Sequence, residues 1–167
     1  MDGKIGIKLG AVMAVVMALL LGLYSILMGA FACVEAWAGY LFFWFWSSIR
    51  GFAFKPLRYD IPNALVGILL SFGMFRAHGA LPAGTFDAVI MITLTVVLFF
   101  SITKLIPYVV GDTTFLFFTI LTGNTMLAQA DYKDIAISYV VGVVFFLLTL
   151  GTGVKLLQKK TEKGNSK

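Results

Sequence analysis

The sequence predicts an all-α membrane protein, a bundle of about six transmembrane helices whose two termini both lie in the cytoplasm. Of its 167 residues, 60% are hydrophobic and only 13% are charged, and the mean hydropathy is +0.95. Apolar stretches recur along the whole chain, and basic residues cluster at the ends of alternate stretches. A soluble domain needs more polar surface to cover its core, so the apolar excess must face lipid.

The apolar stretches divide the chain into spans. A spanning helix needs about 20 apolar residues, which leaves room for one transmembrane domain and almost nothing outside it. No convincing cleavage site follows the first stretch, so we expect it to remain in the mature protein. The domain covers residues 1–167 and ends in a basic cytoplasmic tail at 158–167, and the expected spans are 9–28, 30–49, 57–75, 86–102, 106–127 and 135–157.

The distribution of basic residues sets the expected orientation. With six spans and the N-terminus inside, eleven Lys and Arg residues fall on the cytoplasmic side and two, Arg76 and Lys133, on the outer side. This bias obeys the positive-inside rule, and an odd number of spans would remove it. The cytoplasmic residues are Lys4, Lys8, Arg50, Lys55, Arg58, Lys104, Lys155, Lys159, Lys160, Lys163 and Lys167.

The net charge of +5 does not indicate a nucleic-acid partner, because the basic residues stand at span ends and in the tail. There they act as topology signals and as anchors to the anionic lipid of the bilayer. The sequence has a single histidine, His78, a single cysteine, Cys33, and no phosphate-binding, dinucleotide-binding or metal-binding motif. We therefore expect neither an enzyme nor a bound cofactor or metal.

Two segments of the chain echo one another. Ile61-Pro62 opens the third expected span and Ile106-Pro107 opens the fifth, each after a basic connection. Both spans would cross from inside to outside, which indicates a tandem helix-hairpin repeat of parallel sense, as some transporters have. Two Ile-Pro pairs also arise by chance in so apolar a chain.

One acid, Asp112, falls in the inner half of the fifth expected span and is followed by Thr113 and Thr114. A carboxylate in hydrocarbon costs about 2.5–3.5 kcal/mol, so such a residue faces the bundle interior or a water-filled cavity. Pro107 removes a backbone donor nearby, and irregular backbone at this depth is tolerated where it lines a cavity. The alternative is a structural hydrogen bond within the bundle. We predict an inner solute site of Asp112, Thr113 and Thr114, with Asn63 at the cytoplasmic mouth.

A second acid, Glu35, lies near the outer end of the second expected span. Trp37 and Tyr40, three residues apart, share a helix face close to it. Aromatic walls beside an acid would suit a small planar or cationic solute, so we predict an outer selection site of these three residues. The alternatives are an acid at headgroup level and an ordinary aromatic belt at the membrane interface.

Small residues occur at helix-packing spacings near both ends of the chain. Gly6 and Gly10 form a GxxxG pattern, and Gly151 and Gly153 stand in the last span. Such patterns favour close helix contact, and six short helices leave little room for a pore. We therefore expect a homo-oligomer.

The layout of the chain combines an early Trp- and Phe-rich helix, the Asn-x-x-x-Gly pattern from Asn63 to Gly67, a helix with Pro107 before Gly111 and several phenylalanines, and a basic tail. In these features it resembles a family of small bacterial inner-membrane proteins catalogued as domain of unknown function 1097. The likeness covers nearly the whole chain, but Asp112 and its two threonines stand where small or apolar residues would be expected. The resemblance implies a helical bundle and a multi-pass location in the bacterial inner (cytoplasmic) membrane, and no substrate.

These observations predict a small-solute channel or facilitator that passes a compact polar molecule such as urea, an amide, ammonium or an amine. One alternative is a proton-coupled transporter in which Asp112 takes up a proton. Another is a membrane scaffold or accessory subunit that transports nothing.

Overall fold

The computed structural model describes residues 7–78, 80–123 and 129–152, and within them every regular element is helical. This confirms the prediction of an all-α fold. The elements are α1 (Ile7–Ala30), α2 (Trp37–Trp44), the π-helical segment η1 (Phe45–Ile49), α3 (Leu57–His78), α4 (Ala83–Thr103), α5 (Asp112–Leu121) and α7 (Tyr132–Thr149). Gly6, Gly153 and the tail 158–167, on which predictions were made, lie outside the described residues.

Two helices are shorter than predicted. α2 begins only at Trp37, and α5 contains 10 residues. The spans predicted at 30–49 and 106–127 are therefore too long. Ala32 and Lys104 have φ angles of 51° and 53°, so an α-helix cannot continue through either connection. The predicted spans do break near Lys104, but they miss the non-helical residues 31–36 and 106–111, because these are largely apolar.

Three helices, α3, α5 and α7, begin at residues that favour a helix start. The side chain of Asp131 accepts hydrogen bonds from the backbone N–H groups of Lys133 (3.0 Å) and Asp134 (3.2 Å), and so caps the start of α7. Asp60 and Asp112 stand in the first turns of α3 and α5, where a negative charge interacts favourably with the helix dipole.

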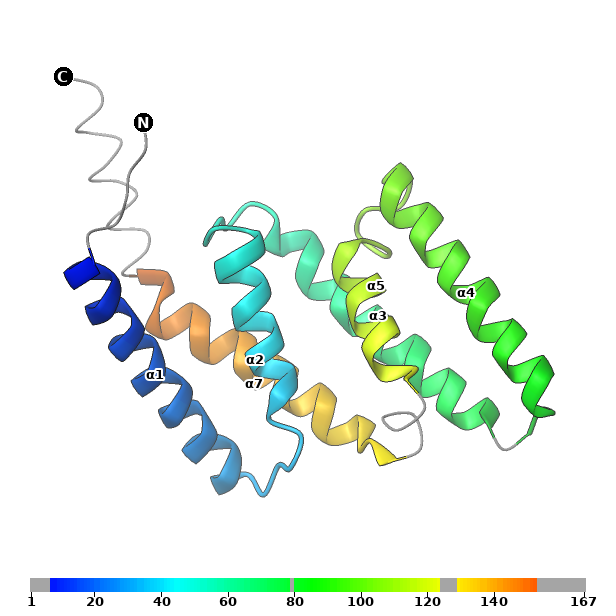
Figure 1. The fold of residues 1–167 in the computed structure, drawn as a ribbon, viewed down its shortest axis with the longest axis horizontal. Helices are drawn as coiled ribbons and strands as arrows, with labels where there is room; N and C mark the ends of the chain where they lie inside the picture. The colour runs from blue at the N-terminus through cyan, green and yellow to red at the C-terminus, as the bar shows by residue number, and fades with distance from the viewer. Residues whose placement is uncertain (1–6, 79, 124–128, 153–167) are drawn as a thin grey trace.

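The helices alternate in direction along the chain. In the view of Figure 1, α1, α3 and α5 run downward, whereas α2, α4 and α7 run upward. The most extensive packing joins α3 to α5 and α2 to α7, so the core is built from helices distant in sequence. The connections gather at two ends of the molecule (Figure 1). We call them the Arg50 end, which contains residues 50–56 and 104–111, and the Glu35 end, which contains residues 31–36 and the start of α7.

The helices divide into two units of three. The first unit is α1, α2 with η1, and α3, and the second is α4, α5 and α7. Trp37 and Asp112, the first residues of α2 and α5, are 75 residues apart, and so are Leu57 and Tyr132, the first residues of α3 and α7. Corresponding helices run in opposite directions in Figure 1. The two units therefore form an inverted repeat.

The parallel hairpin repeat expected from the two Ile-Pro pairs is wrong. Pro62 lies inside α3, whereas Pro107 lies in the connection before α5, so the pairs are not equivalent. The second-unit counterpart of α3 is α7, which runs the other way. At the spacing of 75 the units share two short patterns, namely Leu41-Phe42-Phe43 with Leu116-Phe117-Phe118, and Val66-Gly67 with Val141-Gly142.

The repeat also relates the two places where helices cross most closely. A Cβ atom on Gly142 of α7 would lie 2.5 Å from the Cα of Gly39 in α2. A Cβ atom on Gly67 of α3 would lie 2.7 Å from the backbone oxygen of Thr114 in α5. Gly39 and Thr114 are 75 residues apart, as are Gly67 and Gly142. Each crossing therefore needs a glycine at the same position of its unit.

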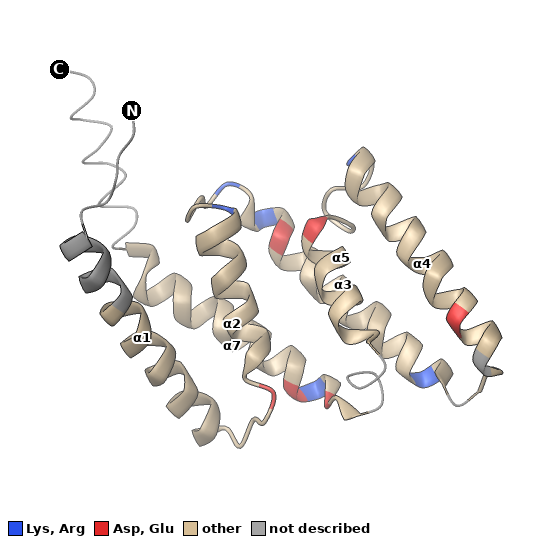
Figure 2. Cartoon of the chain, in the orientation of Figure 1, with Lys and Arg blue, Asp and Glu red and all other residues tan. Residues whose placement is uncertain are grey.

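The outer surface of the bundle is apolar. Large hydrophobic side chains are exposed along α1, α3, α4 and α7, including Leu19, Ile26, Leu69, Ile102 and Leu148 at 67–72% exposure. Among the described residues, two helical segments, Gly84–Thr103 and Tyr132–Thr149, are long and apolar enough to cross a membrane. The charged residues gather towards the two ends of the molecule (Figure 2).

Candidate functional site

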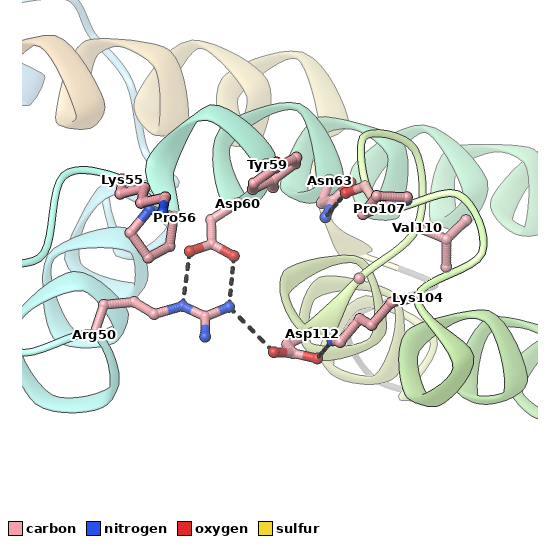
Figure 3. A pocket seen from close by; sticks show the side chains of 11 residues that line it. Arg50, Lys55, Pro56, Tyr59, Asp60, Asn63, Lys104, Pro107, Val110 and Asp112 are labelled. Atoms are coloured by element: carbon pink, nitrogen blue, oxygen red, sulfur yellow. Dashed lines mark hydrogen bonds and ion pairs between the residues drawn. The ribbon is translucent and has the colours of Figure 1, made fainter.

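A pocket of about 420 Å³ lies at the Arg50 end, where the end of η1, the starts of α3 and α5 and the end of α4 meet. Its walls come from both units of the repeat. Figure 3 shows a chain of charged side chains across it. The pocket is lined by Arg50, Lys55, Pro56, Tyr59, Asp60, Asn63, Lys104, Pro107, Val110, Gly111 and Asp112.

The centre of this chain is a two-pronged ion pair between Arg50 and Asp60. Arg50 Nε donates to Asp60 Oδ2 at 2.8 Å, and Nη2 donates to Asp60 Oδ1 at 2.7 Å. The carboxylate side chain is only 4% exposed and the guanidinium side chain 25%. A carboxylate buried to this degree is stable as an anion only if its oxygens are bonded, which the fork of Arg50 achieves.

The second carboxylate, Asp112, extends the chain to the other unit. It accepts from Arg50 Nη2 at 3.1 Å, from Ser101 Oγ at 2.9 Å and from Lys104 Nζ at 2.6 Å. Its side chain is 42% exposed, so it faces the open part of the pocket. Arg50 thus joins a carboxylate of the first unit to one of the second.

The pocket carries both signs of charge. The hydrogen bonds that Arg50 donates to Asp60 raise the pKa of Arg50; partial burial opposes this, and the charge of Asp112 adds to it. Arg50 therefore stays charged, and Lys55 and Lys104 add two basic side chains. With the two carboxylates, the pocket offers hydrogen-bond donors and acceptors side by side, with one more positive than negative charge.

Asn63 gives the pocket a buried amide. Its Nδ2 donates to the backbone oxygen of Pro107 at 3.0 Å, and the residue is 2% exposed. Its Oδ1 has no hydrogen-bond partner among the described residues. Gly111 is required beside it, because a Cβ atom at that position would collide with Asn63 Nδ2. Asn63 therefore lies against the pocket while its acceptor oxygen stays buried.

The two threonines of the predicted inner site do not line the pocket. Thr113 Oγ1 donates to the backbone oxygen of Asp60 at 2.8 Å, and Thr114 Oγ1 donates to that of Asn63 at 2.9 Å. Both are buried, at 3% and 0% exposure. They fasten α5 to α3, so the structural hydrogen-bond alternative is correct for them. Asp112 itself stands at the start of α5 and not within a long span.

The predicted outer site lies at the opposite end of the molecule. Glu35 is in the connection before α2 and accepts a hydrogen bond from Trp37 Nε1 at 2.6 Å. The indole ring stacks on Phe117 with centroids 6.4 Å apart. Tyr40 turns towards α1, where its hydroxyl contacts Ser25 and the backbone oxygen of Leu21. Glu35, Trp37 and Tyr40 therefore do not share the pocket at the Arg50 end.

The structure brings together residues that sequence reasoning did not combine. Asp112 and Asn63 were predicted and do line the pocket. Arg50 and Lys104 were interpreted only as topology signals, and Asp60 was not singled out. One sequence signal was available, since Asp60 is an acid at the start of an apolar helix directly after a basic connection.

The comparisons with known proteins add nothing to this geometry. No family model, no curated protein and no solved structure matches the chain. The resemblance to the family of unknown function stays a prediction from layout. Among the described residues, no group of three or more His, Cys, Asp or Glu side chains could hold a metal ion.

Proposed function

We propose that the protein is a multi-pass protein of the bacterial inner membrane that moves a compact polar solute across it. The exposed apolar faces of α1, α3, α4 and α7 support a membrane location, because soluble monomers rarely expose large contiguous apolar patches. The middle of the molecule, between the charges at its two ends in Figure 2, has the character of a hydrocarbon band.

The proposed topology keeps both termini in the cytoplasm. The first described residues of α1 and the last of α7 lie on the same side as the basic Arg50 end (Figure 1), which is the cytoplasmic side by the positive-inside rule. Four helices, α1, α3, α4 and α7, would cross the bilayer. α5, with 10 residues, is about 15 Å long and is too short to cross alone. α2 is also short, so we treat both as half-length helices inside the bundle.

The observation that carries the transport proposal is the ion-paired pocket between the two units. Half-length helices at the interface of inverted repeats commonly form solute sites in transporters. Here Arg50 and Lys55 supply donors, while the exposed carboxylate of Asp112 supplies acceptors, which suits a small molecule with both kinds of group. Urea, a small amide or an amine meets this requirement. A homo-oligomer in the bilayer remains part of the proposal.

The contacts of Asp112 give less support to proton-coupled transport. A carboxylate bonded to Arg50 at 3.1 Å and to Lys104 at 2.6 Å is held in its ionised form. Glu35 and Trp37 stay candidates for the outer part of the solute path.

The test is solute flux in proteoliposomes containing urea, acetamide, ammonium or methylamine. The wild-type protein should raise the permeability to at least one of them. Arg50→Gln should reduce that flux about tenfold or more, because hydrogen bonds to charged groups are worth about 1.5–3 kcal/mol. Arg76→Gln, an exposed arginine at the Glu35 end, is the matched control and should not. Permeability equal to that of protein-free liposomes for every solute would reject the proposal and favour an accessory subunit.

A further inference from the structure

We infer that the protein is a carrier that exposes its solute to one side of the membrane at a time. Its two inverted units move relative to one another, and this movement takes the protein from one state to the other. The inference rests on the proposed function and adds how the solute crosses. In this structure the pocket at the Arg50 end is open, whereas at the Glu35 end the chain before α2 is bonded to the start of α7, beside a separate hollow of about 470 Å³ lined by Phe72, Phe75 and residues 129–133. In the second state the Glu35 end opens and the Arg50 pocket closes.

The repeat assigns a counterpart to each wall of the pocket. Asn63 in α3 corresponds to Ser138 in α7, and Asp112 at the start of α5 corresponds to Trp37 at the start of α2, each pair being 75 residues apart. The starts of α2 and α7 lie together at the Glu35 end (Figure 1). In inverted-repeat transporters, the two halves rock about a fixed site so that the ends open in turn.

The side chain of Ser138, the counterpart of Asn63, has hydrogen-bond partners. Ser138 Oγ accepts from the Gly39 backbone N–H at 3.2 Å and lies 3.0 Å from the Tyr24 hydroxyl, which also donates to the Ser138 backbone oxygen at 2.8 Å. Asn63 Oδ1, in contrast, has no partner among the described residues. The same position of the repeat thus has its hydrogen bonds at one end, and at the other carries a buried acceptor without a partner among the described residues.

Direct contacts between the units close the Glu35 end. Asp134 Oδ2 accepts a hydrogen bond from the Val34 backbone N–H at 2.9 Å. Cys33 Sγ donates to the Asp134 backbone oxygen at 3.4 Å, and Cys33 is 8% exposed. Burial, and then the nearby charge of Asp134, raise the pKa of the Cys33 thiol. The native cysteine is therefore an unreactive thiol for as long as this end stays closed.

Buried aromatic rings separate the two ends. The Trp37 ring stacks on Phe117, and the Tyr139 ring meets Phe117 at 5.2 Å and Phe42 at 5.9 Å between centroids. Phe42, Phe117 and Tyr139 are at most 3% exposed. A permanently open pore would need a gap where these rings touch. The two glycine crossings flank this layer and supply backbone contacts about which the units can rock.

The test measures the reaction of single thiols with a small maleimide in the purified, detergent-solubilised protein. Native Cys33 reports on the Glu35 end. A Val110→Cys substitution in a Cys33→Ser background reports on the pocket, because Val110 lines it; both reporter positions are 8% exposed here, so the test compares the change in each rate. Asp134→Ala removes the acceptor of the Val34 hydrogen bond. Asp87→Ala is the matched control, because Asp87 is an exposed acid with no hydrogen bond to another described residue.

We expect Asp134→Ala to speed the reaction of Cys33 about fivefold, the effect of one ordinary hydrogen bond on an equilibrium. In the reporter background, the same substitution should slow the reaction at Val110→Cys. Arg50→Gln removes an ion pair between the units that this state also contains, so it should likewise speed the reaction of Cys33. Asp87→Ala should change neither rate.

Faster Cys33 reaction without any change at Val110→Cys would mean local loosening and would overturn the inference, as would unchanged rates at both positions. If Asp134→Ala does not fold, the effect of Arg50→Gln on Cys33 decides the matter from the other end. This experiment does not measure flux. If the thiol rates at the two ends change independently but the protein still moves solute in proteoliposomes, the proposed function stands and the carrier mechanism alone is wrong.

Discussion

The two interfaces between the units, α3 with α5 and α2 with α7, have the same geometry and different chemistry. Each is a close crossing with a glycine at the same position of its unit, Gly67 in one and Gly142 in the other. The α3–α5 interface ends in the ion pairs of Arg50, Asp60 and Asp112, whereas at the α2–α7 crossing Ser138 makes neutral hydrogen bonds with the backbone of Gly39 and with Tyr24 of α1. The repeat fixes the packing, and the charged residues line a pocket at the Arg50 end.

The largest effect should come from the glycine crossing itself. Gly142→Ala places a methyl group against the backbone of Gly39, which cannot move aside as a side chain can. We expect a loss of about 3 kcal/mol in stability, at the upper end for overpacking, measured as a fall in the thermal unfolding temperature in detergent. Gly73→Ala in α3 has open space around its Cβ and is the control. Equal unfolding temperatures for the two variants would mean that the crossing is not close.

The next effect should come from the charged interface. Arg50→Gln leaves the carboxylate of Asp60, 4% exposed, without its ionic partner. Because Arg50 is itself partly exposed, we expect a loss of about 2 kcal/mol, less than for a fully buried pair. Arg58→Gln, an exposed arginine nearby, should change the unfolding temperature little. If the two variants unfold alike, the ion pair does not hold the interface.

The smallest effect should come from the neutral interface. Tyr24→Phe removes the hydroxyl that bonds Ser138 but keeps the ring, and Tyr24 is fully buried. We expect a loss of about 1 kcal/mol, the usual value for one hydrogen bond. Tyr108→Phe, at an exposed tyrosine, is the control and should be neutral. A loss for Tyr24→Phe as large as that for Arg50→Gln would remove the contrast between the interfaces.

Sequence reasoning predicted the helical fold but not how it is divided. The apolar runs located the four long helices, α1, α3, α4 and α7, because each of these runs is much longer than the polar interruptions within it. The runs at 30–49 and 106–127 hid two half-length helices, since the non-helical residues 31–36 and 106–111 are themselves largely apolar. The inverted repeat was missed because the units share little more than a Leu-Phe-Phe and a Val-Gly pattern.

The site was predicted in part for a similar reason. Asp112 stood out because an acid in an apolar span is costly, and it does line the pocket. The partners of Asp112 come from other helices, and no local pattern reports that Arg50 reaches it across 62 residues of sequence. Thr113 and Thr114 looked like pore-lining residues, yet their hydroxyls bond the backbone of α3.

The most direct test of a two-state carrier is counterflow in proteoliposomes. Vesicles are loaded with an excess of the unlabelled solute that shows the largest flux, and uptake of a trace of labelled solute is followed. A carrier that alternates between the Arg50 end and the Glu35 end accumulates the label transiently above its external concentration. Uptake that only rises to the external concentration, at a rate independent of preloading, would contradict alternating exposure and indicate an open pore.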